Sequence, residues 1–459
     1  MNDVYQMRIK GFFVFLFFLL LTACNVNTSG VTSTDSTQPA TSSSTPINVD
    51  PGVVYTPDNA FDYVNHLRQI AGLTVLNWNN QLATAANNHA YYLTINPFSG
   101  HSETLGLNGF TGASVFDRVN AAGYLSRAVG EGLATQTNYQ AAIDDLFSAI
   151  YHRFTLLDFA FNEIGISTFD MIGNSNQGVI VHDMGNSLRN DLCKGSSFSN
   201  IGLYYPNECA DPNFRIEATQ YDNANKTNEA KNPELVVWPP AGSVDIPPAF
   251  FGESPNPLKD YYPNGYKVSG YPVSLQFNPA YVNTVNIKSI NLYRDDTGEI
   301  ISDTLKMSSN TNTLQNGVTD PNQEFTDLEF ALFPLQRLDW NTKYRVDIEY
   351  AIDGGSLVTK QWTFTTRKLL QNIITLPSGT DTFSIPANTK TAVYIPPLDY
   401  NDTIASYAYK NPQNVVVNSS FIDSDTLLIS VSGNPGQQVT MQFTSNGVSG
   451  IRNIIATIE

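Results

Sequence analysis

The sequence predicts a multidomain protein in which a mixed helix and sheet domain is followed by two antiparallel β-sandwich modules. Three observations predict this class. The chain has 459 residues, too many for one ordinary hydrophobic core, and 41% of them are hydrophobic. Apolar residues recur at helical spacing in four segments between residues 56 and 149. From residue 236 to the end, short alternating segments are separated by turn residues.

The first domain combines four predicted helices with two predicted strands. A helix over residues 56–70 is expected to begin at Thr56 as N-cap, followed by a proline and an acid in the first turn. The other predicted helices cover residues 79–95, 114–122 and 139–149, and the predicted strands cover 163–169 and 178–183. Helices around a small sheet indicate a layered α/β or α+β domain.

The N-terminus predicts export and a lipid anchor. Arg8 and Lys10 precede an apolar run over residues 11–21. That run suits a signal peptide but is too short to span about 30 Å of hydrocarbon. The run ends in a segment, residues 21–24, that resembles a bacterial lipobox, in which Cys24 becomes the acylated N-terminus. We therefore expect the signal peptide, residues 1–23, to be removed and the protein to be held at a bacterial membrane, either the outer membrane or the cell surface.

Residues 24–50 are predicted to be a disordered tether. Between residues 28 and 45, 12 of the 18 residues are Ser or Thr, and no apolar periodicity is present. Such a segment cannot bury enough apolar surface to offset the entropy lost on ordering.

The net charge indicates which partners the protein can bind, and the cysteine content is interpreted together with its compartment. The 25 Lys and Arg residues against 42 Asp and Glu residues give a net charge of −17, which argues against nucleic acid as a partner. The polar but weakly charged composition is typical of exported β-rich proteins. Cys193 and Cys209 form an even pair, and in an oxidising compartment we expect them to form a structural disulfide.

Eight short motifs between residues 58 and 185 carry a resemblance to a known family. They are Val64 to Arg68 with Gly72-Leu73, Leu76-Asn77-Trp78, Gly100 to Glu103, Gly109 to Gly112, Ala122-Gly123-Tyr124, Gly130-Glu131-Gly132, Tyr151-His152-Arg153 and Glu163-Ile164-Gly165. In this order they resemble the CAP superfamily (SCP domain) of cysteine-rich secretory, antigen-five and pathogenesis-related proteins. The resemblance implies a three-layer α-β-α sandwich with a large cleft, assigned here to residues 51–235.

The resemblance also implies which side chains line the cleft. Family members place two histidines and one or two glutamates there, and the matching positions are His101, Glu131 and His152. The chain departs from the family at Gly132, where Asn usually follows the glutamate. It departs again where the second acid of eukaryotic relatives is expected, and Glu103 is the candidate to replace that acid.

Two imidazoles and a carboxylate are sufficient to hold a divalent metal such as Zn²⁺ with one open position. However, His101 and His152 lie 51 residues apart and lack the helical spacing of hydrolytic zinc sites. We therefore expect a cleft that binds a ligand with or without a metal, and we assign no catalytic residue. The ligand is expected to be a small hydrophobic molecule or an extracellular protein or glycan. A zinc-dependent hydrolase that uses His101, Glu131 and His152 is the alternative.

Other polar residues of this domain are predicted to be structural. His89 falls on the apolar stripe of its helix, so we expect a core or wall histidine. Asn65 and Arg68 are expected to orient neighbouring backbone, and Asp144 is expected on a solvated helix edge.

The rest of the chain is predicted to form two β modules. The polar stretch 223–231 and the proline-rich residues after it indicate a boundary. Alternating segments near 344–350 and 362–366 resemble bacterial immunoglobulin-like domains, assigned here to residues 236–368, with Trp362 and Phe364 in the core. Residues 369–459 form a second β module without a recognised family. A surface adhesin or scaffold that acts through these modules is a further alternative.

Overall fold

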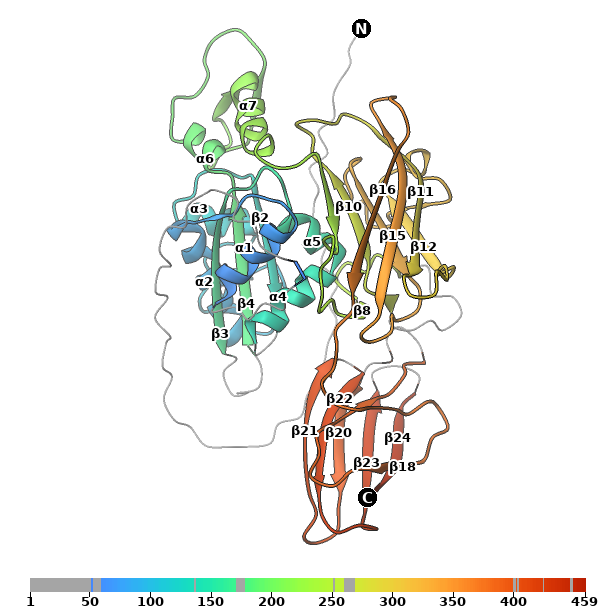
Figure 1. Ribbon diagram of the computed structural model, residues 1–459. Coiled ribbons are helices and arrows are strands. Elements are labelled where there is room, and N and C mark those ends of the chain that lie inside the picture. The colour runs from blue at the N-terminus through green and yellow to red at the C-terminus, as the bar shows by residue number, and fades with distance from the viewer. Residues whose placement is uncertain are drawn as a thin grey trace. The chain divides into compact units, whose positions relative to one another are not determined.

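The computed structural model describes residues 51–52, 59–135, 138–170, 178–250, 252–259, 269–398, 402, 404–423, 425–445 and 449–459. The predicted signal peptide, the predicted tether and Cys24 lie outside these ranges. The described chain forms two compact units (Figure 1). The first unit contains Asn77–Tyr139 and Glu163–Tyr221, and the second contains residues 51–76, Gln140–Asn162 and Asp222–Glu459.

The first unit is built on a four-stranded sheet in the order β1-β3-β4-β2. β1 (Asn77–Trp78) runs parallel to β3 (Glu163–Asp170), and β4 (Gly178–Gly185) lies antiparallel to both β3 and β2 (Val129–Ala134). The two strands predicted from alternating apolar residues are thus confirmed. β2 was not predicted because glycines interrupt its apolar pattern.

Helices α2 (Asn80–Ile95) and α3 (Val115–Ala121) complete the core of the first unit (Figure 1). The side chain of Asn79 caps α2, and Ser114 and Asp117 form a capping box on α3. α2 packs directly on the sheet, because a Cβ atom on Gly165 would lie only 1.9 Å from the backbone nitrogen of Ala83. The predicted helices at 79–95 and 114–122 are confirmed.

A small disulfide-linked substructure ends the first unit. It contains α6 (Ser187–Cys193) and the hairpin of β5 (Tyr204–Pro206) with β6 (Arg215–Glu217). Cys193 and Cys209 are joined as predicted. The two cysteines pack with Ile216 and Tyr221 in a core of their own.

The second unit contains α1 (Ala60–Ile70), α5 (Ile150–Leu156), nearly all of α4 (Tyr139–Ser148) and most of α7 (Ala218–Glu229). The predicted start of the first helix was wrong. Asn59 is the N-cap of α1, because its Oδ1 accepts a hydrogen bond from the backbone N–H of Asp62 at 2.9 Å.

Arg68 and Asn65 on α1 bind backbone as predicted. Asn65 exchanges hydrogen bonds with the backbone of Leu76, and the Arg68 guanidinium donates to the carbonyl oxygens of Thr74, Leu156 and Asp158. Together these bonds tie α1 to the end of α5.

Asp144 is not on a solvated edge, contrary to the prediction. It accepts a hydrogen bond from the hydroxyl of Tyr63 at 2.5 Å and pairs with Arg367 at 3.2 Å. Burial raises the pKa of Asp144, and the charge of Arg367 opposes that rise. The sequence did not indicate this ion pair because Arg367 lies 223 residues away from Asp144.

Most of the polar stretch 223–231 lies in helix α7. Asn228 in this helix and Asn232 after it are buried and donate hydrogen bonds to the carbonyl oxygens of Ala160 and Phe159. The amides of these two residues therefore serve as internal hydrogen-bonding groups.

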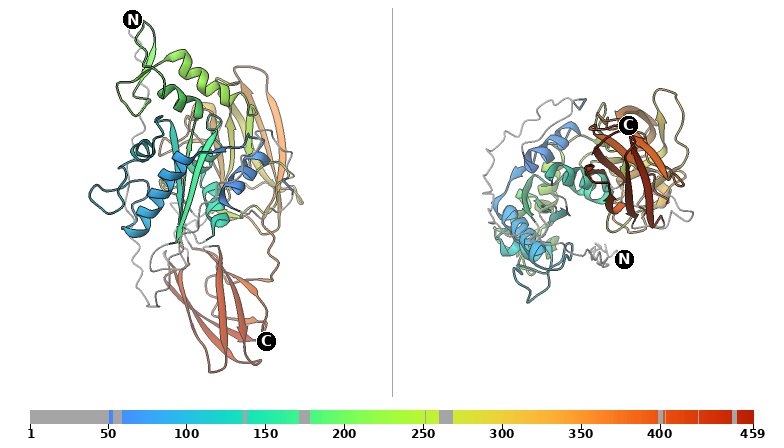
Figure 2. Two further views of the ribbon diagram at one scale, coloured as in Figure 1. Left: turned by 90° about the vertical axis from the view of Figure 1, so that its left-hand side faces the viewer. Right: turned by 90° about the horizontal axis from the view of Figure 1, so that it is seen from below.

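The remainder of the second unit consists almost entirely of strands, as predicted (Figures 1 and 2). One sheet has the order β13-β12-β14-β10-β7 and another the order β11-β15-β16. Their strands are β7 (Leu235–Trp238), β10 (Val273–Phe277), β11 (Val285–Arg294), β12 (Thr304–Ser308), β13 (Val318–Thr319), β14 (Glu329–Pro334), β15 (Lys343–Ile352) and β16 (Val358–Thr365). A short pair, β8 (Ala249–Phe250) with β9 (Ser269–Gly270), and the 3-10 turn Thr311–Thr313 accompany them.

Two further sheets follow, in the orders β17-β19-β22-β21 and β18-β24-β23-β20. Their strands are β17 (Ile373–Thr375), β18 (Thr382–Ile385), β19 (Thr391–Tyr394), β20 (Ile404–Lys410), β21 (Val416–Asp423), β22 (Thr426–Ser432), β23 (Gln438–Ser445) and β24 (Ile451–Ile458). The prediction of purely antiparallel sheets was wrong at three short pairs, β12 with β13, β17 with β19 and β18 with β24, which are parallel.

Two aromatic residues of the β region, Trp362 and Phe364, were predicted to lie in its core. Trp362 and Phe364 are buried, and the indole N–H of Trp362 donates to the carbonyl oxygen of Pro239. Both aromatic residues therefore act as core residues, as predicted. No helix in the described part of the chain is long and apolar enough to cross a membrane.

Candidate functional site

The candidate site of the first unit begins with two carboxylates placed side by side on neighbouring strands. Glu131 on β2 lies directly opposite Asp183 on β4 in the antiparallel register. Directly opposed residues point to the same face of a sheet, so the two side chains share one environment. Both are almost completely buried, with 2% of the Glu131 side chain exposed.

Glu131 is held as a carboxylate by two partners. The Nδ1 atom of His101 lies 2.8 Å from Glu131 Oε1, and the Arg118 guanidinium on α3 donates to Oε2 at 2.6 Å. Burial by itself would raise the pKa of Glu131, but the hydrogen bond from His101 and the charge of Arg118 outweigh it and hold that pKa well below its usual range. A buried charge with such partners is stable only while both remain.

His101 is the accessible member of this group. Its side chain is 26% exposed, whereas those of Glu131 and Arg118 are nearly inaccessible. The structure therefore brings together two of the residues predicted for the cleft, His101 and Glu131. It presents the imidazole at the surface with a charged pair behind it.

Glu103 occupies a second buried position in the same unit and does not face water. Its Oε2 accepts hydrogen bonds from the backbone N–H groups of Thr111 and Gly112, and its Oε1 lies 3.0 Å from His89 Nδ1. Burial alone would raise the pKa of Glu103. The hydrogen bonds from His89 and from the two backbone N–H groups have the larger, opposite effect, so the pKa of Glu103 is lowered. Glu103 thus holds the loop between α2 and α3 in place.

His89 behaves as the predicted core histidine. It is buried on α2, and its Nε2 atom lies 2.9 Å from the carbonyl oxygen of Gly100. Both ring nitrogens lie within hydrogen-bonding distance of an oxygen atom, that of the Gly100 carbonyl on one side and that of the Glu103 carboxyl on the other. His89 and Glu103 together support the segment that carries His101.

Asp183 is the second buried acid of the site. Burial and the negative charge of Glu131 both raise the pKa of Asp183 well above its usual value, and the charge of Arg118 opposes that rise. The pKa values of the two opposed carboxyl groups are therefore shifted in opposite directions.

The departure from the family pattern at Gly132 has a steric cause. Gly132 pairs with His182 across β2 and β4, on the opposite face from Glu131 and Asp183. A Cβ atom on Gly132 would lie 2.3 Å from Nε2 of His182. The imidazole of His182 fills the space that a side chain at residue 132 would need.

His152, the third predicted cleft residue, belongs to the second unit and has a partner there that the sequence did not suggest. Its Nδ1 atom lies 3.1 Å from Oε2 of Glu253, which follows β8. Glu253 is 2% exposed and also accepts hydrogen bonds from the backbone N–H groups of Ile150 and Tyr151. Glu253 therefore caps the first turn of α5 and holds His152 at the same time.

Helix α5 is fastened to the β region by more than this carboxylate. Ile150 and Phe154 share an apolar core with Phe250 and Phe333. The buried guanidinium of Arg153 donates to the carbonyl oxygen of Pro272 at 2.7 Å. The position of His152 thus depends on residues far outside its own sequence neighbourhood.

The geometry of the first unit fits a metal poorly. The Arg118 guanidinium, 2.6 Å from Glu131, already balances the charge of that carboxylate. Across the described ranges, no three His, Cys, Asp or Glu side chains are grouped so that they could hold a metal ion. The metal predicted from the sequence therefore stays a prediction.

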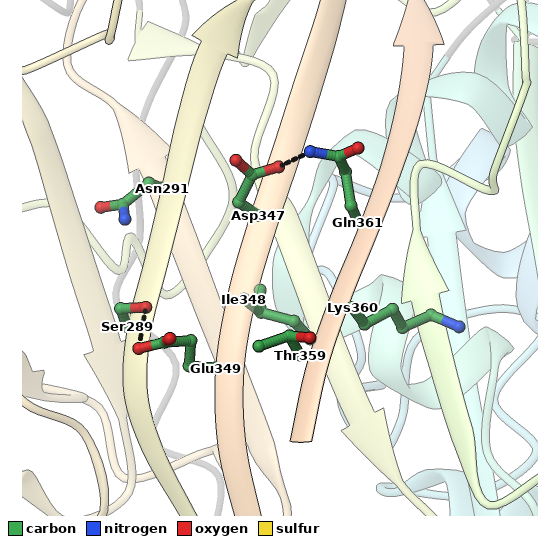
Figure 3. Close-up of a pocket in the computed structure, with 8 residues that line it drawn as sticks. All are labelled: Ser289, Asn291, Asp347, Ile348, Glu349, Thr359, Lys360 and Gln361. Carbon is green, nitrogen blue, oxygen red and sulfur yellow. Dashed lines mark hydrogen bonds between the residues drawn. The ribbon is translucent and has the colours of Figure 1, made fainter. Parts of the chain in front are cut away.

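A separate polar concavity of about 620 Å³ lies on the sheet β11-β15-β16 (Figure 3). The strand register aligns Asn291, Asp347 and Gln361 in one row and Ser289, Glu349 and Thr359 in the next. Gln361 donates to Asp347 at 2.8 Å. The concavity offers neutral and charged hydrogen-bonding groups but little apolar surface.

Three residues of these sites were missed by sequence reasoning: Arg118, Asp183 and Glu253. A signal for Asp183 was present, because the adjacent pair His182 and Asp183 interrupts the otherwise apolar strand 179–184. Arg118 and Glu253 lie 13 and 101 residues from the groups they bind, and no local pattern indicates those contacts.

Comparison with known proteins supports the resemblance over part of the chain. Residues 61–177 match the model of the family described as "CAP: Cysteine-rich secretory protein family". No curated protein sequence gives a significant match.

Two solved structures match part of the chain. An extracellular protein containing a SCP domain from Bacillus anthracis is 22% identical, with 27% of this chain and 38% of that chain covered and a TM-score of 0.24. An outer surface protein from Borrelia burgdorferi is 18% identical, with 27% and 87% covered and the same TM-score. The chain thus spans less than half the length of the Bacillus protein, and these scores support no argument about function.

Proposed function

Starting from the match of residues 61–177 to the cysteine-rich secretory protein family, we propose that this chain is an exported protein that binds a ligand through the His101 and Glu131 site. The observation that carries the proposal is the arrangement of one accessible imidazole in front of a buried carboxylate and guanidinium. Buried charged groups behind one exposed polar group orient that group, which is how ligand sites obtain specificity.

The ligand we propose is a lipid-like molecule or an extracellular partner with a group that accepts or donates a hydrogen bond to His101. A capture experiment tests this. Immobilised protein is exposed to extracts of the cell envelope and growth medium, and retained molecules are identified by mass spectrometry. We expect retention by the parent chain and its loss in His101→Ala. Exposed Asp353→Asn serves as the matched surface control, and equal retention by all three proteins would contradict the proposal.

We also propose that the protein is anchored by acylation of Cys24 after removal of residues 1–23. The support is the sequence pattern alone, because these residues lie outside the described ranges. Mass measurement of the mature N-terminal peptide tests it. The expected result is a peptide that begins at Cys24 with added acyl mass, and an unmodified Cys24 would contradict the proposal.

A metal-dependent hydrolase that uses His101, Glu131 and His152 is the alternative function. Metal analysis of the purified chain together with turnover of a peptide library tests it. Stoichiometric, tightly held zinc and loss of turnover in His101→Ala would favour the hydrolase over the binding protein.

We further propose that residues 236–368 and 369–459 form two sandwich modules. In the later region, the strands β19 and β22 share one apolar core with β23 and β24 of the other sheet. The polar concavity on β11-β15-β16 favours a second function, adhesion to a glycan (Figure 3). Binding to a glycan array should be lost in Asp347→Ala and retained in His101→Ala, and retention in both variants would contradict it.

A further inference from the structure

Two aliphatic side chains stand fully in solvent at one point of the first unit. Ile201 is completely exposed and Leu203 is 82% exposed. They lie in the loop between α6 and β5, drawn in green beside α6 and α7 in Figure 1. Contiguous exposed apolar surface on a soluble protein marks a site of contact with a protein or a membrane.

The loop is held rigidly at its base. The Cys193–Cys209 disulfide closes it. The backbone N–H of Phe198 donates to the carbonyl oxygen of Arg215, and that of Ala218 donates to the carbonyl oxygen of Leu203. Only residues 199–203, which we call the tip, extend beyond these two bonds. The exposure of its aliphatic residues is therefore built into a fastened structure.

The tip is also free of charge. From residue 195 to residue 207 the sequence contains no Asp, Glu, Lys or Arg, although the whole chain has a net charge of −17. Transfer of the tip out of water thus requires the desolvation of no ionised side chain. Tyr204, half-exposed at the base under the Arg215 guanidinium, supplies an aromatic ring of the amphipathic kind that suits a membrane interface.

We propose that the tip inserts into the interfacial region of a lipid bilayer. A specific protein partner would need about 800 Å² of surface on each side, far more than a tip of five residues provides. A bilayer requires only a few apolar side chains, which suffice for reversible binding and orient a protein that a second signal anchors. This interaction is independent of the ligand site and does not require acylation of Cys24.

Vesicle sedimentation tests the proposal with the chain from residue 24 onward carrying Cys24→Ser, so that no acyl chain contributes. The probe is vesicles of phosphatidylethanolamine and phosphatidylglycerol at a 3:1 ratio. We expect measurable binding that does not weaken with added salt, because the tip is uncharged and salt screens the repulsion between the acidic chain and the anionic lipid. The double variant Ile201→Ser with Leu203→Ser should partition about tenfold or more weakly, since two aliphatic side chains are lost.

The matched control is Leu105→Ser. Leu105 is 81% exposed in a different loop, between α2 and α3, so it tests for general apolar adhesion. Its partitioning should equal that of the parent. In addition, tryptophan fluorescence should shift to the blue with vesicles in Leu203→Trp and remain unchanged in Leu105→Trp.

Three results would overturn the proposal: no binding above the vesicle-free control, equal binding by the double variant, or an equal loss in Leu105→Ser. Sedimentation velocity without vesicles checks one other occupant, a second copy of the chain. A parent that self-associates while the double variant is monomeric would assign the tip to self-association and contradict the membrane proposal.

Discussion

Replacement of Glu253 by Ala should release helix α5 from the β region and with it the predicted cleft residue His152. Glu253 accepts the backbone N–H of Ile150 at 2.6 Å and that of Tyr151 at 3.2 Å, and it lies 3.1 Å from His152 Nδ1. The Glu253 side chain is nearly inaccessible to solvent, so water does not compete with it for these backbone N–H groups.

The magnitude follows from these contacts. Each buried donor left without an acceptor costs about 1–3 kcal/mol, and an anion at a helix N-terminus contributes about 0.3–1 kcal/mol more. Glu253→Ala leaves two backbone donors without an acceptor, so we expect the free energy that keeps α5 in its closed state to fall by roughly 2–7 kcal/mol. Glu253→Gln keeps one acceptor oxygen but loses the charge, and its effect should be about half as large.

Hydrogen exchange at residues 150–154 measures this directly, because an opening free energy lowered by 1.4 kcal/mol speeds exchange tenfold. The amides should exchange at least tenfold faster in Glu253→Ala than in the parent. Asp353→Asn, which removes an exposed carboxylate that accepts the backbone N–H of Thr284, is the control and should leave these amides unchanged. Unaltered exchange in Glu253→Ala would refute the capping role.

Three further predictions concern single side chains. Burial and the charge of Asp423 raise the pKa of Asp425 to about 8, so the folded state loses stability as pH rises from about 4 to about 8. Urea unfolding at pH 5 and pH 7 should show a loss of about 3 kcal/mol in the parent between these two pH values, and Asp425→Asn should remove that loss. Gly132→Ala should destabilise the first unit in thermal unfolding, because its Cβ would overlap His182, and an unchanged midpoint would contradict the steric reading. Arg118→Met should cost about 3–5 kcal/mol in urea unfolding because it leaves the Glu131 carboxylate buried without its counter-charge, and a loss below 1 kcal/mol would show that the pair contributes little.

Local patterns were sufficient for the elements whose cause is local. The helix at residues 80–95 has its own cap in Asn79 and an apolar stripe. Apolar residues alternate in strand 163–170, and strand 178–185 is a short run that is buried throughout. The predicted helix 139–149 agrees with α4, whereas the helix α5 that follows it was not predicted. The N-cap residue of α5, Ala149, makes no side-chain cap, and Glu253, 103 residues away from Ile150, supplies the missing acceptor.

The candidate site shows the same division. His101 and Glu131 were identified through a family resemblance, and the structure places them 2.8 Å apart. The residues that lower the pKa of Glu131 and raise that of Asp183 come together only through tertiary packing. A buried ionic network of this kind depends on partners from several elements, and a single sequence does not indicate which cation will face which carboxylate.

Native mass spectrometry of the chain isolated from its own cell tests the ligand-binding proposal most directly. The parent protein should carry an additional mass beyond any acyl group on Cys24, and this mass should be absent from His101→Ala, since the imidazole is the accessible group of the site. A parent chain of bare mass, or the same additional mass in both proteins, would contradict the assignment of ligand binding to His101 and Glu131.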